Sequence, residues 1–323
     1  MAGAVRLSEH PDFAAFLTAA AADSGLPETF VEKDYWITEI LRTIAATLGE
    51  RAIFKGGTSL SKGWSLLDRF SEDIDLFVDP AAEPPLGSKR AIDRTMKELN
   101  GDVSAIDGLE FVRAESRTTG GRGRIDTFRY HSHFPPLEGF PATVRLEPGI
   151  QSGKQPTARV KISSIVGDLL SARGAADELD IEGIEPFEMD LLHFRRTFVE
   201  KLFAINGKVE RLEKEGVSLG RDVRHYADLH VLAGRAEVIG MLESDEYEAI
   251  RLDYDEKSRT YFPNSYRPPP DLRFTSSNAL FPPDELRARI EPGYEEECQR
   301  LFFRPHPGFG EVLERFAALR DLL

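Results

Sequence analysis

The sequence predicts an α+β fold, in which a mixed sheet flanked by helices precedes a mainly helical C-terminal lobe. The first observation is a strand, a Gly-Gly turn, a helix and a second strand in succession over residues 52–78. The second is strand-like alternation in three later segments, residues 109–115, 124–133 and 142–149. The third is helical spacing of apolar residues from Met189 onward. We therefore expect a first lobe of residues 1–186 and a second of residues 187–323.

Further helices are predicted at residues 8–24, 28–48, 89–99, 284–303 and 310–323. Residues 160–165 read as a short strand, followed by a connecting stretch that runs to Pro186. The proline-dense residues 254–283 contain several aromatic side chains, so we expect a loop packed on the body of the protein. Val31–Ile37 is polar within an apolar helix, and the residues by themselves predict an exposed helical turn.

The stretch from residue 52 to residue 78 organises the chain. Ala52–Lys55 is predicted as an apolar strand that ends at a Gly-Gly turn, after which a helix opens. The apolar stripe expected for this helix comprises Leu60, Trp64 and Leu67. A glycine pair lets backbone amides approach a phosphate closely, and a helix N-terminus favours negative charge. The turn therefore predicts phosphate contacts from Gly56, Gly57, Thr58 and Ser59.

The returning strand carries two aspartates on one face. At the two-residue period of a strand, Asp73 and Asp75 point to one side, while Ile74, Leu76 and Val78 point to the other. Two neighbouring carboxylates repel each other, and a divalent cation between them reverses the sign of that interaction. Because hard oxygen ligands suit magnesium, Asp73 and Asp75 are predicted metal ligands.

These motifs resemble a known family. Phe-Lys-Gly-Gly-Thr-Ser-Leu over residues 54–60 and Phe-Ser-Glu-Asp-Ile-Asp-Leu over residues 70–76 are similar to the polymerase-beta-like nucleotidyltransferase superfamily. The amino-acid sequences of these two segments resemble the AbiEii/AbiGii toxin family of type IV toxin–antitoxin systems more closely still, and this family includes the MenT toxins. The resemblance covers residues 31 to about 230. A loop and an acidic edge strand without catalytic function are the alternative.

The resemblance implies a third carboxylate on a strand beside the two aspartates. Glu147 is the candidate, because alternation places Thr143, Arg145 and Glu147 on one face and the phrase Arg-Leu-Glu-Pro-Gly resembles the family segment. A surface glutamate that closes the strand before Pro148 is the alternative. With Glu147, the expected cofactors are two Mg²⁺ ions and the co-substrate is an NTP.

The second lobe contributes two further candidates to the nucleotide site. Lys201 lies within an apolar stripe of the helix over residues 191–206, where a buried lysine is costly unless it meets an anion. The surrounding Thr-Phe-Val-Glu-Lys-Leu resembles a family motif whose lysine binds nucleotide phosphates, and an internal pair with Glu200 or another acid is the alternative. The resemblance also carries the functional aspartate of the family onto Asp228, with Asp222 as the second choice.

Charge and composition limit the functions that the chain can have. The formal net charge of −14 argues against general affinity for nucleic acids. Nine basic and four acidic residues between Arg113 and Lys161 nevertheless give that segment a charge of +5, and its loop of residues 116–124 is either an RNA contact or a solvated turn. A single cysteine, Cys298, and the absence of long apolar runs predict a cytoplasmic protein.

Taken with the residues, the resemblance implies a toxin that transfers a nucleotide from an NTP to the 3′ end of tRNA, releases pyrophosphate and blocks translation. Asp73, Asp75, Glu147, Lys201 and Asp228 would be the catalytic residues. The implied partners are the tRNA acceptor end and an antitoxin encoded nearby, with no membrane. Two alternatives stay open, namely nucleotide transfer to a small hydroxylated molecule and a non-catalytic module that binds nucleotide or a partner.

Overall fold

A computed structural model describes residues 5–71, 73–135, 137, 139–175, 179 and 181–323. Glu72 of the aspartate motif and Glu138 of the basic segment lie outside these residues. The chain divides into two compact units. The first comprises Met1–Gly63, Glu72–Ile150 and Ala158–Leu191, and the second comprises Trp64–Ser71, Gln151–Thr157 and Leu192–Leu323. Two short segments that precede residue 186 therefore belong with the C-terminal unit.

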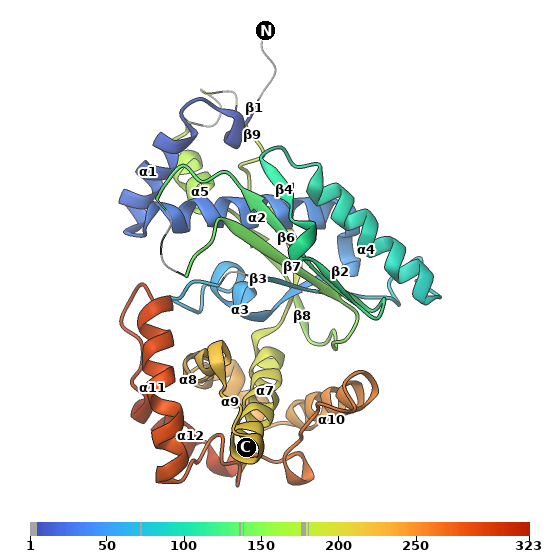
Figure 1. The fold of residues 1–323 in the computed structure, drawn as a ribbon, viewed down its shortest axis with the longest axis vertical. Helices are drawn as coiled ribbons and strands as arrows, with labels where there is room; N and C mark the ends of the chain where they lie inside the picture. The colour runs from blue at the N-terminus through green and yellow to red at the C-terminus, as the bar shows by residue number, and fades with distance from the viewer. Residues whose placement is uncertain (1–4, 72, 136, 138, 176–178, 180) are drawn as a thin grey trace. The chain divides into compact units, whose positions relative to one another are not determined.

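The first unit is built on a mixed sheet (Figure 1). Its strands lie in the order β4-β6-β7-β3-β2-β10-β8, with β5 paired to β6. The bounds are β2 Ala52–Lys55, β3 Asp73–Val78, β4 Leu109–Phe111, β5 Arg117–Thr119, β6 Gly123–Tyr130, β7 Thr143–Gly149, β8 Thr157–Ile162 and β10 Phe187–Leu192. Strand β3 runs antiparallel to β2 and parallel to β7. A separate parallel pair joins β1 Val5–Arg6 to β9 Ile181–Glu182. The predicted mixed sheet with flanking helices is confirmed.

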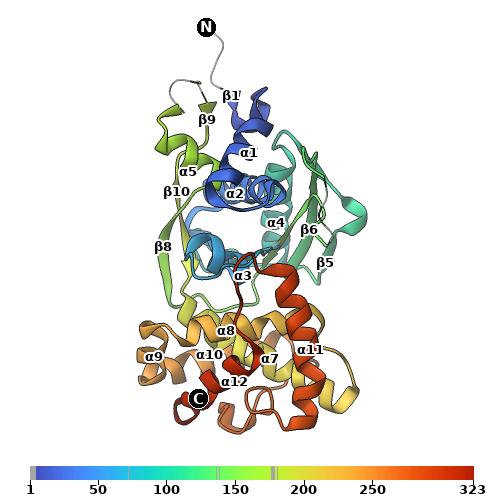
Figure 2. The same cartoon turned by 90° about the vertical axis from the view of Figure 1, so that its left-hand side faces the viewer.

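Helices cover one face of this sheet. Trp36 of α2 Glu28–Leu48 stacks on Tyr130 of β6, with ring centroids 5.7 Å apart. Strand alternation gives the face of Tyr130 a row of fully buried side chains, Phe128, Val144, Leu146 and Ile74. Helix α4 Lys89–Ser104 packs on α2 and on β6 (Figure 1). Helices α1 Phe13–Ser24 and α5 Ile165–Ala172 pack on α2 and on each other (Figure 2).

The helix predicted to follow the Gly-Gly turn is much shorter than expected. A single turn, α3 Gly56–Thr58, continues as a π-helix over Ser59–Gly63 and then ends. A Cβ atom at Gly63 would lie 2.1 Å from Leu191 Cδ2, so the chain passes too close to β10 for another side chain there. The predicted stripe is divided between the units, since Leu60 packs in the first and Trp64 donates to the backbone oxygen of Leu192 in the second.

Other predicted elements need correction. The strand expected over residues 109–115 ends at Phe111 and continues as a 3₁₀ turn, Arg113–Glu115. The connecting stretch before Pro186 contains α5, whose N-cap Ser164 accepts from the amide of Gly167. The helix expected from Met189 begins only at Phe194, because Phe187–Leu192 forms strand β10 inside the sheet. Residues 254–283 are helical up to Tyr261 and form a loop only afterwards.

The second unit is mainly helical, as predicted (Figure 1). Its helices are α7 Phe194–Glu215, α8 His225–Ala233, α9 Ala236–Leu242, α10 Asp245–Tyr261, α11 Asp284–Leu301 and α12 Phe309–Ala318, and the 3₁₀ turn Gly220–Arg224 leads into α8. Helix α7 packs on α8, α9 and α10, and α12 packs on α8 and α11. Tyr226 of α8 is fully buried and contacts Phe309 edge to face. Among the described helices, none combines the length and the hydropathy that a membrane span requires.

The polar phrase at the start of α2 is buried, so its interpretation as an exposed turn is wrong. Glu32 has no exposed surface and accepts from the Ser132 hydroxyl and from the ring and amide of His133. Asp34 Oδ1 accepts from Lys62 Nζ at 2.6 Å, and its other oxygen accepts from the amide of Ile165 at 2.9 Å. Since Lys62 belongs to the π-helix, Asp34 fixes the segment that follows the Gly-Gly turn.

We expect Asp34→Ala to lower the free energy of unfolding by about 3 kcal/mol. The substitution leaves the ammonium of Lys62, whose side chain is 6% exposed, without its carboxylate. A matched control is Asp93→Ala in the surface pair Asp93–Lys97, which has the same 2.6 Å separation but side chains 31% and 61% exposed. That control should cost no more than about 0.5 kcal/mol. Urea unfolding measures both, and equal losses would contradict a special role for Asp34.

Candidate functional site

The predicted site residues fall into two groups. Gly56 to Ser59, Asp73, Asp75 and Glu147 lie in the first unit, whereas Lys201 and Asp228 lie in the second. Within each unit the structure brings the predicted residues together. The two groups are described in turn.

In the first unit, strand pairing assembles the three predicted carboxylates. Asp75 of β3 lies beside Glu147 of β7 in a parallel register, and Asp73 lies beside Arg145. Lys55 of β2 is the partner of Asp75 on the other side. These five residues share the sheet face opposite to the one that α2 covers, because they alternate with Ile74 and Leu146. Glu147 is therefore a neighbour of the aspartate pair, as the sequence predicted.

The Gly-Gly turn lies directly against this strand. Gly56 has a φ of +77°, and a Cβ atom there would lie 2.0 Å from Asp75 Oδ2. The Thr58 hydroxyl donates to the backbone oxygen of Asp73, and the Ser59 hydroxyl donates to the backbone oxygen of Gly56 at 2.9 Å. Both hydroxyl side chains are buried. Any phosphate contact from this turn would thus depend mainly on its backbone amides, since the two hydroxyls hold the turn in place.

Arg145 is the counter-ion of the carboxylate group. Its Nη2 atom donates to Glu147, and its Nε atom lies 3.6 Å from Asp73 Oδ1. Burial and the neighbouring Asp75 raise the pKa of Glu147, while the charge of Arg145 opposes that increase. Arg145 thus contacts two of the three carboxylates, and Lys55 lies beside the third in the sheet register. Three carboxylates on one face repel one another, and a cation among them would reduce that repulsion.

The donor set fits a divalent cation, although the side chains are not converged on one point. Asp73 Oδ1 is buried and has no hydrogen-bond partner in the described part of the chain, which leaves one oxygen with unused capacity. The available donors are carboxylate oxygens, which magnesium prefers. Within the described residues, however, no three acidic, histidine or cysteine side chains already form a metal cluster. A cation at Glu147 would compete with Arg145, which donates to that carboxylate.

In the second unit, Lys201 and Asp228 belong to one buried ionic cluster. Asp228 has no exposed surface, and its Oδ2 atom lies 2.8 Å from Lys201 Nζ. Arg69 makes a two-pronged contact with the same carboxylate, through Nε at 2.6 Å and Nη2 at 2.8 Å. His225 Nδ1 lies 3.0 Å from Lys201 Nζ. The internal acid that pairs with Lys201 is thus Asp228, because Glu200 instead contacts Arg196 at 3.0 Å.

The protonation states of this cluster follow from burial and charge. Burial alone would raise the pKa of Asp228, but the charges of Arg69 and Lys201 hold it well below the usual range. Burial lowers the pKa of Lys201 even though Asp228 opposes that change. Burial and Lys201 also lower the pKa of His225 to about 4, so its ring is neutral near pH 7. Because an ammonium only donates, the neutral His225 accepts from Lys201.

Asp222, the second choice for the functional aspartate, lies outside this cluster's core. Its carboxylate contacts Lys208 at 2.5 Å, and its side chain is 33% exposed. Arg69 and His225 are the members that the sequence analysis missed. His225 is three residues from Asp228, so helical spacing was an available signal. No pattern marks Arg69, which is separated from Asp228 by more than 150 residues.

The basic segment is less available to a ligand than its sequence suggests. Arg124 makes a two-pronged contact with the buried Asp126 and is 12% exposed. Arg145 is engaged with Glu147. Arg117 and Arg122 remain exposed on and beside β5. An RNA contact from this loop would therefore rest on Arg117 and Arg122 and not on Arg124.

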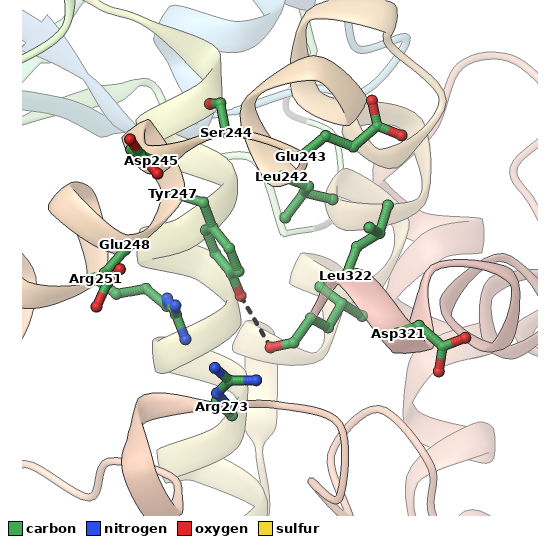
Figure 3. Close-up of a pocket in the computed structure, with 11 residues that line it drawn as sticks. Leu242, Glu243, Ser244, Asp245, Tyr247, Glu248, Arg251, Arg273, Asp321 and Leu322 are labelled. Carbon is green, nitrogen blue, oxygen red and sulfur yellow. Dashed lines mark hydrogen bonds between the residues drawn. The ribbon is translucent and has the colours of Figure 1, made fainter.

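A pocket of about 360 Å³ lies in the second unit at the start of α10 (Figure 3). Tyr247 donates from its hydroxyl to the backbone oxygen of Leu323 at 3.3 Å, and Arg251 and Arg273 lie beside them. The guanidinium of Arg251 stacks over the Tyr247 ring at 4.3 Å. The predicted site residues are not among the described residues that line this pocket.

We expect Gly56→Ala to displace Asp75 as well as to strain the backbone. A positive φ costs an alanine about 1–2 kcal/mol, and the clash with Asp75 should add about 1–3 kcal/mol. Gly25→Ala is the matched control, because Gly25 has a φ of +72° and open space around it. Urea unfolding compares the two variants. If both lose the same stability, Asp75 is free to move and the turn does not position it.

Comparisons with known proteins identify the family and the fold. The family described as nucleotidyl transferase AbiEii toxin, type IV TA system, matches residues 39–315, well past the region around residue 230 where the motifs end. Among solved structures, the chain is similar to MenT4, a nucleotidyltransferase toxin from Mycobacterium tuberculosis H37Rv. The TM-score is 0.58 at 19% identity, over 95% of this chain and 89% of that chain, so the likeness concerns the fold. No curated protein matches the chain.

The family match spans most of the chain and includes both clusters, and it confirms the resemblance on which the sequence analysis relied. The chain therefore belongs to the AbiEii nucleotidyltransferase toxin family of type IV toxin–antitoxin systems.

Proposed function

We propose that this toxin transfers a nucleotide from an NTP to the 3′ end of tRNA, with release of pyrophosphate, and so blocks translation. The observation that carries the proposal is the group of three carboxylates beside the Gly-Gly turn, with Asp75 in register with Glu147 and packed against Gly56. Nucleotide transfer needs both a metal-binding carboxylate group and a turn that accepts phosphates. Binding without turnover needs fewer acidic residues at such a place.

In the proposed reaction, the 3′ hydroxyl oxygen of the acceptor forms a bond to the α-phosphorus of the NTP. The bond from that phosphorus to the bridging oxygen breaks, pyrophosphate leaves, and the hydroxyl proton is lost to solvent. Bound Mg²⁺, held by Asp73, Asp75 and Glu147, would supply Lewis-acid neutralisation of the phosphate charge. The amides of the Gly56–Ser59 turn would orient the phosphates, and Lys201 would add a point charge to the triphosphate.

Family membership also supports a protein partner. A type IV toxin–antitoxin family implies a cognate antitoxin for this toxin. We propose that such an antitoxin is encoded nearby and that it counteracts the nucleotide transfer.

One observation favours a second candidate, nucleotide transfer to a small hydroxylated molecule. The whole chain has a formal net charge of −14, and Arg124 and Arg145 of its basic segment are occupied by internal acids. A small acceptor would not need a basic surface. Incubation with total tRNA and each labelled NTP distinguishes the candidates, since label would appear in tRNA only for the first.

We expect Asp73→Asn and Asp75→Asn to abolish transfer to tRNA while leaving the fold intact. Each substitution removes one of several repelling carboxylates, so the stability of the metal-free protein should stay the same or increase slightly. Incorporation of labelled nucleotide measures activity. Thermal unfolding without and with Mg²⁺ measures the stability of the metal-free protein and its stabilisation by the metal. Stabilisation by Mg²⁺ should be smaller in the variants than in the wild type.

Two outcomes would count against this assignment. Full turnover in either variant would remove that aspartate from the metal site. A large loss of stability with no change in the response to Mg²⁺ would make the pair structural. Asp93→Asn, a surface aspartate on α4, provides a control for the loss of one charge.

We expect tRNA binding to weaken with salt and to depend on Arg117 and Arg122. Each phosphate contact contributes a slope of about −0.7 to −0.9 in log affinity against log salt. Arg117→Ser with Arg122→Ser should flatten the slope by about 1.5 and raise the KM for tRNA, while the KM for NTP stays nearly constant.

The matched control for that double variant is Arg259→Ser with Arg287→Ser, which changes the net charge equally. Both arginines pair with acids along their own helices in the second unit. If the control flattened the slope as much, net charge and not a local contact would be responsible. Absence of salt-dependent tRNA binding in the wild type would favour the small-molecule acceptor.

A further inference from the structure

In the buried cluster of the second unit, two cations contact one carboxylate. Arg69 and Lys201 are 1% and 6% exposed, and both contact the single carboxylate of Asp228. A buried charge is costly unless it is paired, and two cations that share one carboxylate are each neutralised only in part. His225 contributes no positive charge near pH 7, because burial and Lys201 lower its pKa to about 4.

The two oxygens of Asp228 are divided unequally between the cations. Oδ1 accepts from Arg69 Nε at 2.6 Å. Oδ2 lies 2.8 Å from both Arg69 Nη2 and Lys201 Nζ. A planar guanidinium that grips both oxygens fixes the orientation of the carboxylate, which a lysine cannot do. Lys201 therefore meets an oxygen that Arg69 already occupies.

Arg69 itself has no route to a ligand. Its Nη1 atom donates to the backbone oxygen of Phe70 at 3.0 Å, and its remaining contacts go to Asp228. Backbone hydrogen bonds hold the segment around Arg69 in the second unit. The amide of Phe70 donates to the backbone oxygen of Leu301, and the amide of Phe303 donates to the backbone oxygen of Asp68. An effect of Arg69 on a nucleotide would therefore act through Asp228 or through the charge that Arg69 exerts on Lys201.

We propose that Arg69 is a positioning residue, which holds Asp228 so that this carboxylate neutralises Lys201 only in part and leaves Lys201 able to bind a nucleoside triphosphate. This inference rests on the proposed function for the role of Lys201. It assigns Asp228 to charge control and not to proton transfer, in agreement with its complete burial. Without Arg69, Asp228 would turn entirely to Lys201 and compete with the triphosphate.

The test compares Arg69→Met, Arg69→Lys and Arg196→Met with the wild type. Arg196 is a matched control in the same unit, since it is 2% exposed and paired with Glu200 and Asp253. Equilibrium titration of the four NTPs needs no acceptor and no turnover. Arg69→Met should weaken binding by about tenfold, Arg69→Lys should retain part of the affinity, and Arg196→Met should bind as the wild type does.

Two further readouts separate positioning from general destabilisation. In a Lys201→Ala background, Arg69→Met should have almost no additional effect on NTP affinity, because its action passes through Lys201. The pH dependence should also change. Lys201 faces Asp228 and His225 on α8, Arg224 on the preceding turn, and Arg69, whose charge lowers the pKa of Lys201. NTP affinity falls as Lys201 loses its proton, and Arg69→Met should move that fall to higher pH.

The experiment distinguishes a result against the proposed function from a result against this inference alone. If the wild type binds none of the NTPs, the proposed function is wrong and this inference falls with it. If the wild type binds but both Arg69 variants match Arg196→Met in affinity and in pH profile, Arg69 is structural and the inference alone is overturned. Should Arg69→Met fail to fold, Arg69→Lys decides the question, because it keeps the charge but not the two-pronged contact with Asp228. Unchanged NTP affinity in Arg69→Lys would then overturn the proposal.

Discussion

The in-register pairing of β3 with β7 is the constraint on which the proposed metal site depends. It places Asp75 beside Glu147 and Asp73 beside Arg145, although about seventy residues separate the two strands in the chain. A shift of one residue would turn Glu147 toward the face covered by α2 and bring Leu146 to the carboxylate face. The buried row of Ile74, Leu146 and Phe128 opposes that shift, because a shift of one residue would move part of the row to the other face. The hydrophobic face thus secures the position of the polar face.

The two clusters have opposite charge imbalances. In the first unit, Arg145 contacts Asp73 and Glu147, and Asp75 lies on the same face, so the carboxylates outnumber this arginine. In the second unit, Arg69 and Lys201 share Asp228, so the cations outnumber the carboxylate that they contact. An excess of carboxylate suits a divalent cation, and an excess of buried cation suits a phosphate group.

The grouped carboxylates of the first unit and the grouped cations of the second both have an energetic cost that the surrounding fold must offset. The Gly-Gly turn accepts a positive φ at Gly56 so that its backbone can lie against Asp75, and Asp34 on α2 holds Lys62 at the other end of the same short helical segment. In the second unit, Arg69 is contributed by a short segment that lies far from α7 and α8 in the sequence. Strained or charged groups of this kind persist only where neighbouring contacts fix them.

The sequence by itself determined the elements whose signal is local. The period of two in residues 73–78 and 143–149 predicted strands with Asp73 and Asp75 on one face and Glu147 on a polar face, and the structure confirms those strands. The resemblance of the motifs predicted the family, which the match over residues 39–315 confirms. The roles of Gly56 to Ser59, Asp73, Asp75, Glu147, Lys201 and Asp228 in catalysis or binding remain predictions.

Only the tertiary structure decided which distant groups meet. Leu60, Trp64 and Leu67 have helical spacing, yet the chain leaves the helix at Gly63 because β10 lies too close for a further turn. Arg124 appeared available in the sequence, but the fold places it against Asp126. Arg69 carries no periodic signal, and its contact with Asp228 exists only because folding brings the two residues together. Periodicity records which face a residue occupies, whereas an ion pair depends on where two faces meet, and that is a property of the folded chain.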